Sequence, residues 1–230
     1  MTADTAVADF FSNWDVYRAV IDNNCMEHRE IYQTVAPILA RRVAPFSILD
    51  LGCGDAAGIA PLLPDLPLAR YVGVDCAAPA LEHARAMLTP VTDRIELHVA
   101  DMQDFLAATE EHFDVILVSF ALHHLPTSDK LRFLRAARAR LLPDGEVILI
   151  DVVRKDTESR DQYLRRYAGL VSQWPVGTER QRRIVAHVTG NDFPEEVSVL
   201  PGWASAAGFT SVEEFYRGGQ DTQAGWILSR

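Results

Sequence analysis

The stretch that decides the fold is Ser47-Ile48-Leu49-Asp50-Leu51-Gly52-Cys53-Gly54-Asp55-Ala56, residues 47–56. Apolar residues with one acid among them run directly into two glycines that are separated by one residue. This pattern predicts a short buried strand that ends in a turn where the backbone comes close to a ligand. Gly52 and Gly54 lack a Cβ atom, so they can adopt positive φ and leave the main chain open to a bound molecule. Two glycines alone also fit an ordinary tight turn after a strand.

A second strand ends in an acid in the segment Tyr71-Val72-Gly73-Val74-Asp75. Its carboxylate follows the glycine turn by about twenty residues, the spacing at which an acid at the tip of a second strand reaches a ribose hydroxyl. The two strand ends together predict a nucleoside-binding site at the carboxyl ends of parallel strands.

Composition limits the class of protein. The chain has 230 residues, of which 48% are hydrophobic and 23% charged, so one well-buried α/β domain is expected. A formal net charge of -10 argues against nucleic-acid and anionic-membrane binding. No apolar run approaches the roughly twenty residues that cross a bilayer, and the amino terminus lacks a signal-peptide pattern. We therefore expect a cytoplasmic protein, either a monomer or a homodimer. No disulfide or metal site is predicted from the spacing of the three cysteines, Cys25, Cys53 and Cys76.

Strands and helices alternate after the opening stretch, which predicts right-handed crossovers and a doubly wound, mostly parallel sheet. The run Phe113-Asp114-Val115-Ile116-Leu117-Val118-Ser119-Phe120 is typical of a central strand buried on both faces. An antiparallel hairpin is expected to close the sheet at the carboxyl terminus. Strands are expected at 47–51, 71–75, 95–99, 113–120, 146–153, 209–216 and 225–229. Helices are expected within 10–42 with a break at Asn23-Asn24, and at 56–63, 78–88, 130–142 and 203–207.

Four segments follow from this pattern: a helical arm at 1–44, a core at 45–153, a helical insert at 154–200, and a closing helix and strands at 201–230. Residues 1–9 are expected to be frayed, and the helical pattern starts at Phe10 and Phe11. The turn Glu27-His28-Arg29 is either a solvated turn or part of a lid over the ligand. The insert is rich in arginine, which fits either a solvated face or contacts to an acidic substrate.

The ordered motifs resemble the class I S-adenosylmethionine-dependent methyltransferase family of the small-molecule type. The resemblance covers about 45–153 in order and 201–230 more loosely. It implies a seven-stranded Rossmann-like sheet, S-adenosylmethionine as cofactor and S-adenosylhomocysteine as product. One departure is Ala56, where the family turn often has a third glycine. The motifs are Ile48–Ala56, Gly73-Val74-Asp75, Ala100-Asp101-Met102, Phe113–Ile116, Leu122-His123-His124-Leu125, Leu141–Gly145 and Ala207-Gly208-Phe209.

The resemblance also implies roles for residues at the cofactor site. The glycine turn and Asp50 hold the amino-acid half of the cofactor, and Asp75 accepts from the ribose hydroxyls. Asp101 accepts from the adenine amino group, while Met102 packs on the ring. In simpler interpretations, Asp101 is a residue of the turn after its strand and Met102 is a core residue. The implied cofactor residues are Asp50, Gly52, Cys53, Gly54, Asp75, Cys76, Asp101, Met102, Ser119 and Phe120.

Histidines are the candidate catalytic residues because imidazole titrates near neutral pH. His123 and His124 follow the fourth strand, and His28 belongs to the possible lid; packing or cofactor contacts are the simpler roles for the pair. Candidate substrate contacts are Tyr17, His28, Tyr32, His124, Arg165 and Arg166.

Methyl transfer to an oxygen of a small polar or acidic molecule is the function that these features favour. Three alternatives stay open: another S-adenosylmethionine reaction such as cyclisation of the aminobutyrate arm, a non-catalytic cofactor-binding partner subunit, and a nicotinamide oxidoreductase. The last arises because Gly52-x-Gly54-x-x-Ala57 also fits a dinucleotide-binding turn. Asp101-Met102 and the terminal hairpin favour the methyltransferase.

Overall fold

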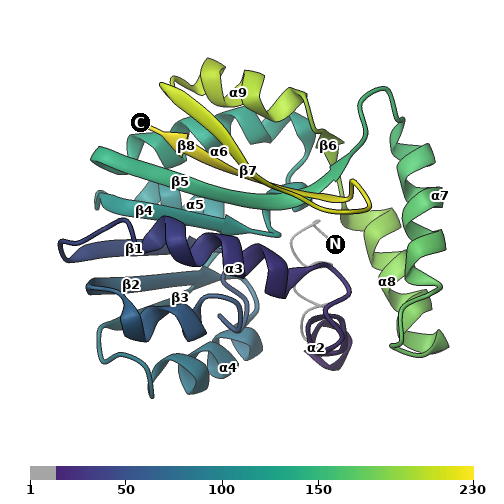
Figure 1. Cartoon of the computed structure of the whole chain (residues 1–230), viewed down its shortest axis with the longest axis horizontal. Helices are drawn as coiled ribbons and strands as arrows, with labels where there is room; N and C mark the ends of the chain where they lie inside the picture. The colour runs from purple at the N-terminus through teal and green to yellow at the C-terminus, as the bar shows by residue number, and fades with distance from the viewer. Residues whose placement is uncertain (1–13) are drawn as a thin grey trace.

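A mixed sheet forms the centre of the computed structural model, which describes residues 14–230 (Figure 1). Its strands are β1 (Phe46–Leu51), β2 (Leu68–Asp75), β3 (Ile95–Val99), β4 (Phe113–Ser119), β5 (Leu141–Arg154), β6 (Glu195–Glu196), β7 (Ser211–Arg217) and β8 (Gln223–Ser229). Seven of them follow the order β3-β2-β1-β4-β5-β8-β7, and the short β6 pairs with β5. The pairs among β1 to β6 are parallel, whereas β8 is antiparallel to both β5 and β7. The predicted fold class is confirmed.

Helices cover both faces of this sheet (Figure 1). They are α2 (Trp14–Asp22), α3 (His28–Leu39), α4 (Ala78–Leu88), α5 (Met102–Ala108), α6 (Thr127–Ala139), α7 (Arg160–Val171), α8 (Thr178–Asn191) and α9 (Val199–Ala207), with 3-10 turns η1 (Ala60–Asp65) and η2 (Leu122–His124). One apolar cluster joins α5, α6 and α9 to the sheet, and a second joins α3, α4 and η1 to the opposite face. The two layers are what a doubly wound topology requires.

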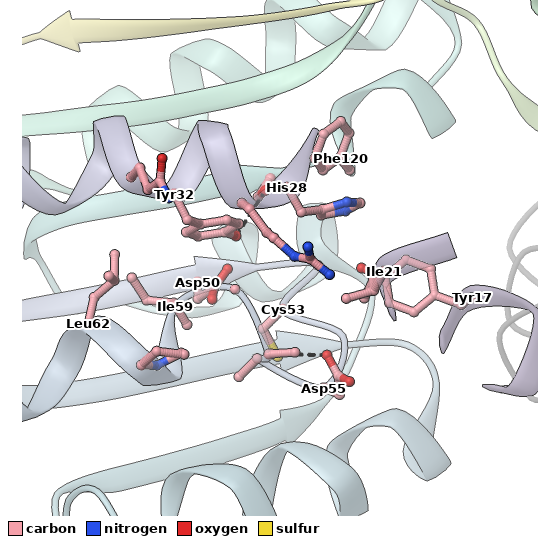
Figure 2. A pocket seen from close by; sticks show the side chains of 18 of the residues that line it. Tyr17, Ile21, His28, Tyr32, Asp50, Cys53, Asp55, Ile59, Leu62 and Phe120 are labelled. Atoms are coloured by element: carbon pink, nitrogen blue, oxygen red, sulfur yellow. Dashed lines mark hydrogen bonds between the residues drawn. The ribbon is translucent and has the colours of Figure 1, made fainter. Parts of the chain in front are cut away.

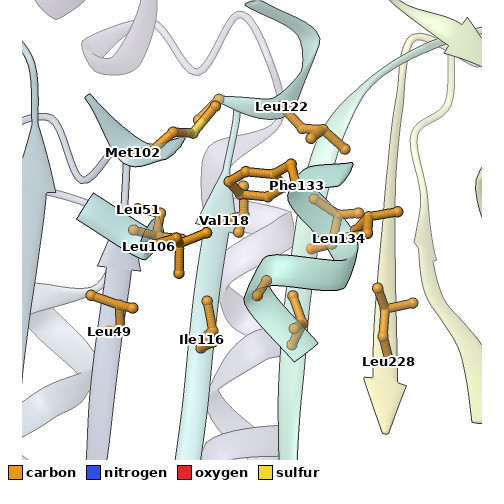
Figure 3. Packing of buried hydrophobic residues seen from close by; sticks show 14 of the residues in the cluster. Leu49, Leu51, Met102, Leu106, Ile116, Val118, Leu122, Phe133, Leu134 and Leu228 are labelled. Atoms are coloured by element: carbon orange, nitrogen blue, oxygen red, sulfur yellow. The ribbon is translucent and has the colours of Figure 1, made fainter. Parts of the chain in front are cut away.

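Alternation along β1 decides what lies on each face. Leu49 and Leu51 point into the cluster with α5 and α6 (Figure 3), whereas Ile48 belongs to the cluster with α3. Asp50 shares the α3 side, where a carboxylate interrupts an otherwise apolar face (Figure 2). A strand reverses its side chains at every residue, so one acid in this position is aimed into the interior beneath α3.

Several predicted boundaries are wrong for local reasons. The helix predicted at 56–63 is instead the 3-10 turn η1, because Pro61 and Pro64 remove backbone donors. Helix α6 spans Thr127–Ala139, so it starts and ends three residues before the predicted helix at 130–142. Strand β5 begins at Leu141, five residues before the predicted start at 146.

Three elements were not predicted: the 3-10 turn η2, helix α5 and strand β6. Helix α5 follows Asp101, whose Oδ1 accepts from the backbone N–H groups of Gln103 and Asp104 at 2.7 and 3.0 Å. Strand β6 has two residues, which is too short for a sequence pattern. The predicted break in the amino-terminal arm is confirmed between α2 and α3.

The arm and the insert pack on each other. A third apolar cluster contains Val16 and Val20 of α2 together with Tyr163 and Tyr167 of α7 and Ile184 of α8. The predictions for residues 1–9 and for a helical start at Phe10 and Phe11 fall outside the described residues. The division into four segments stays a prediction. Within residues 14–230, no helix combines the length and apolar character needed to cross a bilayer.

Candidate functional site

The glycine turn after β1 is shaped by positive φ angles. Gly52 has φ 73°, and a Cβ atom there would lie 2.5 Å from the Cβ of Ala121, which leaves no room for a side chain. The N–H groups of Gly52 and Cys53 both donate to the carbonyl of Val74, at 2.8 and 3.1 Å. Ala56, at the position where the family often has glycine, has φ 57° and so adopts the conformation that glycine favours.

Asp75 lies at the tip of β2 and joins the turn to the next helix. Its Oδ2 accepts from the N–H of Gly54 at 2.9 Å, and its Oδ1 accepts from the N–H of Ala77 at 2.8 Å. Burial raises the pKa of this carboxyl, and the two backbone donors oppose the rise. Each carboxylate oxygen has a second lone pair, so the oriented carboxylate can still accept from two neighbouring hydroxyls.

Asp50 is a buried acid with one hydrogen-bond donor identified among the described residues. The hydroxyl of Tyr71 donates to its Oδ2 at 2.7 Å, and the residue is 3% exposed. Burial raises its pKa to about 7, although the Tyr71 hydroxyl favours the charged form. A cation placed beside this carboxyl would restore its charge.

Asp55 adds a second buried acid to the turn. Its Oδ1 accepts from the N–H of Ala57 at 3.0 Å, while its Oδ2 is buried and accepts no hydrogen bond from the described residues. The nearest cation is Arg18, whose Nη1 lies 3.8 Å from Oδ2. The sequence prediction missed Asp55 as a site residue, although it directly follows the second glycine.

A cavity of about 540 Å³ opens from the turn toward the amino-terminal arm (Figure 2). Its floor includes the acids Asp50 and Asp55, and its opposite wall comes from α2, α3 and η1. The lining combines polar and apolar side chains, as small-molecule sites do. The remaining wall residues include Tyr17, Ile21, Asp22, His28, Arg29, Tyr32, Gln33, Cys53, Ile59, Leu62, Ser119 and Phe120.

Tyr32 ties the arm to the core across this cavity. Its hydroxyl donates to Ser119 Oγ at 3.1 Å, which brings α3 to the end of β4. A Cβ atom on Gly58 would lie 2.2 Å from Cε2 of the Tyr32 ring, so the ring packs on bare backbone. Burial raises the pKa of Tyr32, and of Tyr17 on α2, where the carboxylate of Asp55 adds to the rise. Both phenols therefore stay protonated.

His28 lines the cavity with an uncharged ring. The residue is 8% exposed, its ring centroid lies 4.8 Å from that of Phe120, and neither ring nitrogen has a hydrogen-bond partner among the described residues. Burial lowers its pKa to about 4, with Glu30 opposing. Phe120 has φ 53°, an uncommon conformation for an aromatic residue that often marks functional sites.

Glu27 holds this wall in place. It has φ 59°, and its carboxylate accepts from the Tyr216 hydroxyl at 2.7 Å and from the Gly219 N–H at 3.3 Å. Asn24 Oδ1 accepts from the Arg29 N–H at 2.9 Å, so an asparagine does satisfy the first turn of α3. The turn is therefore anchored to β7 and the hairpin, and it is not simply solvated.

The other predicted substrate and catalytic residues lie apart from the lining of this cavity. Arg166 pairs with Glu158 at 2.8 Å and donates to the carbonyls of Gln220 and Asp221, while Arg165 is exposed. His123 and His124 belong to η2 and face the end of α8. Catalysis by this pair stays a prediction. Among the described residues that line the cavity, the one arginine is Arg29, which the sequence prediction did not assign to the substrate.

Five predicted cofactor residues lie outside this cavity's lining: Gly54, Asp75, Cys76, Asp101 and Met102. Asp101 uses Oδ1 to cap α5, and Met102 is 9% exposed within the core cluster (Figure 3). Gly54 is held by Asp75, and Cys76 follows it, partly exposed. Their adenine and ribose contacts stay predictions.

Comparison with known proteins identifies the domain. Residues 48–145 match the family model described as a methyltransferase domain. This part of the chain is thus similar to a methyltransferase domain, which agrees with the predicted class I S-adenosylmethionine-dependent family. The matched residues include the glycine turn, the acids Asp75 and Asp101, and the predicted motifs up to Gly145.

Similar proteins carry several activities. A carboxy-S-adenosyl-L-methionine synthase from Glaesserella parasuis is 26% identical over 59% of this chain and 57% of its own. A ubiquinone biosynthesis O-methyltransferase from Nitrosospira multiformis is 22% identical over 82% of this chain and 77% of its own. The magnesium protoporphyrin IX methyltransferase structure from Synechocystis, with bound S-adenosylhomocysteine, has a TM-score of 0.71 and 16% identity, covering 100% of both chains, and shows a shared fold. The chain spans between 5% and 60% of the length of the first curated relatives that it matches.

The residues present fit the family's cofactor, S-adenosylmethionine. The cofactor carries a sulfonium and an ammonium group, and the site offers Asp50 and Asp55 as buried carboxylates, one of which keeps an oxygen without a hydrogen bond from the described residues. The glycine turn exposes backbone where a side chain would collide, and Asp75 is oriented to accept from hydroxyls. Two desolvated acids, of which Asp55 has Arg18 at 3.8 Å, are acceptors suited to a cationic ligand.

Proposed function

We propose that this chain is a methyltransferase that transfers a methyl group from S-adenosylmethionine to an oxygen atom of a small polar molecule. The observation that carries the proposal is the cavity that joins the acidic turn to His28, Tyr32 and Phe120. One wall suits a cationic cofactor, and the other offers aromatic rings and a neutral imidazole to an acceptor.

The charge of the cofactor decides which tasks fall to the cofactor and which fall to the protein. When bound, S-adenosylmethionine supplies a methyl group that is already strongly electrophilic. The chain's own residues therefore have to hold the acceptor, exclude water and, for a hydroxyl, receive a proton. We assign orientation of the acceptor to Tyr32 and Phe120, and receipt of the proton to a ring nitrogen of His28. A carboxylate acceptor would need no proton receiver.

Arg29, at the edge of the cavity, supports a polar acceptor, which can carry an anionic group. Its Nη2 donates to the Asp22 carbonyl at 3.0 Å, which holds the guanidinium in place while the side chain stays exposed. The insert arginine Arg166 is already paired with Glu158. Arg29→Ala should therefore raise KM for anionic acceptors, whereas Arg165→Ala should not.

The test is a screen of hydroxyl, carboxylate, amine and thiol compounds with methyl-labelled S-adenosylmethionine, followed by His28→Phe on the best acceptor. Phenylalanine keeps the ring contact with Phe120 and removes both nitrogens. For a hydroxyl acceptor we expect kcat/KM to fall by about 100-fold or more, with S-adenosylhomocysteine affinity nearly unchanged. His112→Phe, at an exposed position, is the control. Labelling of amines or thiols alone would refute oxygen transfer.

A second candidate is a different reaction of the same cofactor. Its support is the similarity to carboxy-S-adenosyl-L-methionine synthases, whose name describes a modified cofactor and not a methylated acceptor. Mass spectrometry of the products separates the two: S-adenosylhomocysteine with a methylated acceptor supports methyl transfer, and a new cofactor derivative or methylthioadenosine supports the alternative. Binding without any product would support the partner-subunit hypothesis.

A further inference from the structure

A buried cluster of histidines and carboxylates lies beneath η2, outside the cavity. His123 and His124 come from η2, and His187 and Asp192 come from the end of α8. Three imidazole nitrogens surround one carboxylate: His123 Nε2 lies 3.8 Å from Asp192 Oδ2, and His124 Nδ1 and His187 Nε2 lie 3.5 and 3.7 Å from Asp192 Oδ1.

These spacings are long for hydrogen bonds but close to those between ligands of one metal ion. Hydrogen bonds of this kind have heavy-atom distances of about 2.7–3.2 Å. In a tetrahedral zinc site with bonds of about 2.0–2.1 Å, neighbouring ligand atoms lie roughly 3.3 Å apart. One ligand atom from each of His123, His124 and Asp192 lies within 4.8 Å of the other two. To reach that spacing, pairs of these atoms would have to approach by up to about 1.5 Å, and His187, which lies outside this group of three, would have to move with them.

Asp192 is the strongest sign of a missing cation. The residue is 4% exposed, and the groups that face its Oδ1, His124 Nδ1 and His187 Nε2, lie 3.5 and 3.7 Å away, beyond ordinary hydrogen-bond distance. The nearby Arg160 donates to the backbone carbonyl of Asp192 at 2.9 Å and to Thr189, and not to the carboxylate. Burying a carboxylate oxygen whose partners stand this far away is costly, and a coordinated cation would remove that cost.

Asp151 orients His123 as a ligand. Its Oδ1 lies 2.5 Å from His123 Nδ1, which places the proton on Nδ1 and directs the lone pair of Nε2 toward Asp192. Metal-binding histidines commonly have such a carboxylate behind them. Lys130 does not supply the missing charge, since its Nζ bonds to Glu195 Oε1 at 2.9 Å and to the Phe193 carbonyl. Asp151 and Asp192 thus leave two negative charges for a divalent cation.

We propose that His123, His124, His187 and Asp192 bind one divalent transition-metal ion, best matched by zinc, that fastens helix α8 of the insert to the core beneath η2. Imidazole and carboxylate ligands suit Zn²⁺ and related ions. Four protein ligands with low exposure describe a closed, structural site and not one that activates water. The sequence could not predict it, because the ligands come from two distant segments.

The test is metal analysis of the full chain, produced without a histidine tag in zinc-supplemented medium. We expect close to one zinc per chain in the wild type and in His112→Ala, and loss of most of it in His187→Ala and Asp192→Ala. Chelation should lower the melting temperature of the wild type by on the order of 10 °C, with little effect on the two cluster variants.

A second measurement uses only the wild type, so it tests the proposal even if the variants fail to fold. Titration of metal-free wild-type protein with Co²⁺ should give the visible absorption of a tetrahedral site, saturating at one equivalent and reversed by Zn²⁺. A wild type that stays metal-free, gives no cobalt spectrum and melts at the same temperature with and without zinc would overturn the proposal. The cluster would then be His123 held as an imidazolium between two carboxylates.

Discussion

Replacing Asp50 by asparagine should make the ligand-free protein more stable, by an amount that depends on pH. The ordinary pKa of the carboxyl is 3.8, and burial raises it to about 7 in the folded chain. Below pH 4 the carboxyl is neutral in both states and imposes no penalty. Between pH 4 and 7 it ionises in the unfolded chain only, so the free energy of unfolding falls as the pH rises; above pH 7 the penalty is constant.

The magnitude follows from the size of the pKa change. At about 1.4 kcal/mol for each tenfold change, the penalty approaches 4 kcal/mol as an upper limit at pH 8. Asparagine keeps an oxygen that can accept from the Tyr71 hydroxyl, which bonds to Asp50 Oδ2 at 2.7 Å. Asp50→Asn should therefore match the wild type near pH 4 and exceed it by a few kcal/mol at pH 8. The same variant should bind S-adenosylhomocysteine more weakly at pH 8, because the ligand's ammonium group loses its carboxylate.

The assay is urea unfolding of ligand-stripped protein at pH 4 to 8. Tyr71→Phe, which removes the donor to Asp50, serves as a matched variant. Without that donor the pKa of Asp50 should rise further, so the fall in stability should extend to higher pH. A stability difference between Asp50→Asn and the wild type that stays the same at every pH, or a wild type that is the more stable at pH 8, would refute the reasoning.

Three further predictions concern the turn, the core and the anchor. Gly52→Ala should destabilise the fold by several kcal/mol, because its Cβ would lie 2.5 Å from that of Ala121, whereas Gly202→Ala, in open space on α9, should stabilise by about 0.5–1 kcal/mol in urea unfolding. Leu134→Ala, at a fully buried position on α6, should lower the free energy of unfolding by about 2–5 kcal/mol; a smaller loss would mean that the cluster collapses around the gap. Tyr216→Phe removes the donor to Glu27, so amide exchange around residues 24–29 should quicken, and unchanged exchange would contradict the anchoring role.

The local part of this site could be predicted from the sequence. Asp50, Gly52 and Asp75 are defined by short-range patterns: an acid in an apolar strand, a residue that has to take positive φ, and an acid at a strand tip. The central strand at 113–120 could also be predicted, because a strand buried on both faces has a nearly continuous apolar sequence. Boundaries failed where prolines or short capped turns decide the conformation, as in η1 and α5.

The long-range part could not be predicted. His28 belongs to a polar turn in sequence, and only the contact with Phe120 shows that its ring is buried. Arg166 belongs to an arginine-rich segment, and only the structure shows that it pairs with Glu158. Asp192 follows an ordinary helix end, and its importance comes from histidines that other segments bring to it.

The central claim is that the acidic turn binds S-adenosylmethionine. Calorimetric titration with S-adenosylhomocysteine and, separately, NAD tests it on the wild type, Asp75→Asn and the control Asp93→Ala, whose side chain is exposed. Asparagine weakens the charge-assisted hydrogen bonds to ligand hydroxyls, so affinity for S-adenosylhomocysteine should fall by about 10- to 100-fold in Asp75→Asn and stay unchanged in the control. NAD should give no signal with any of the three. Binding of NAD without S-adenosylhomocysteine, or S-adenosylhomocysteine binding that ignores Asp75, would contradict the account.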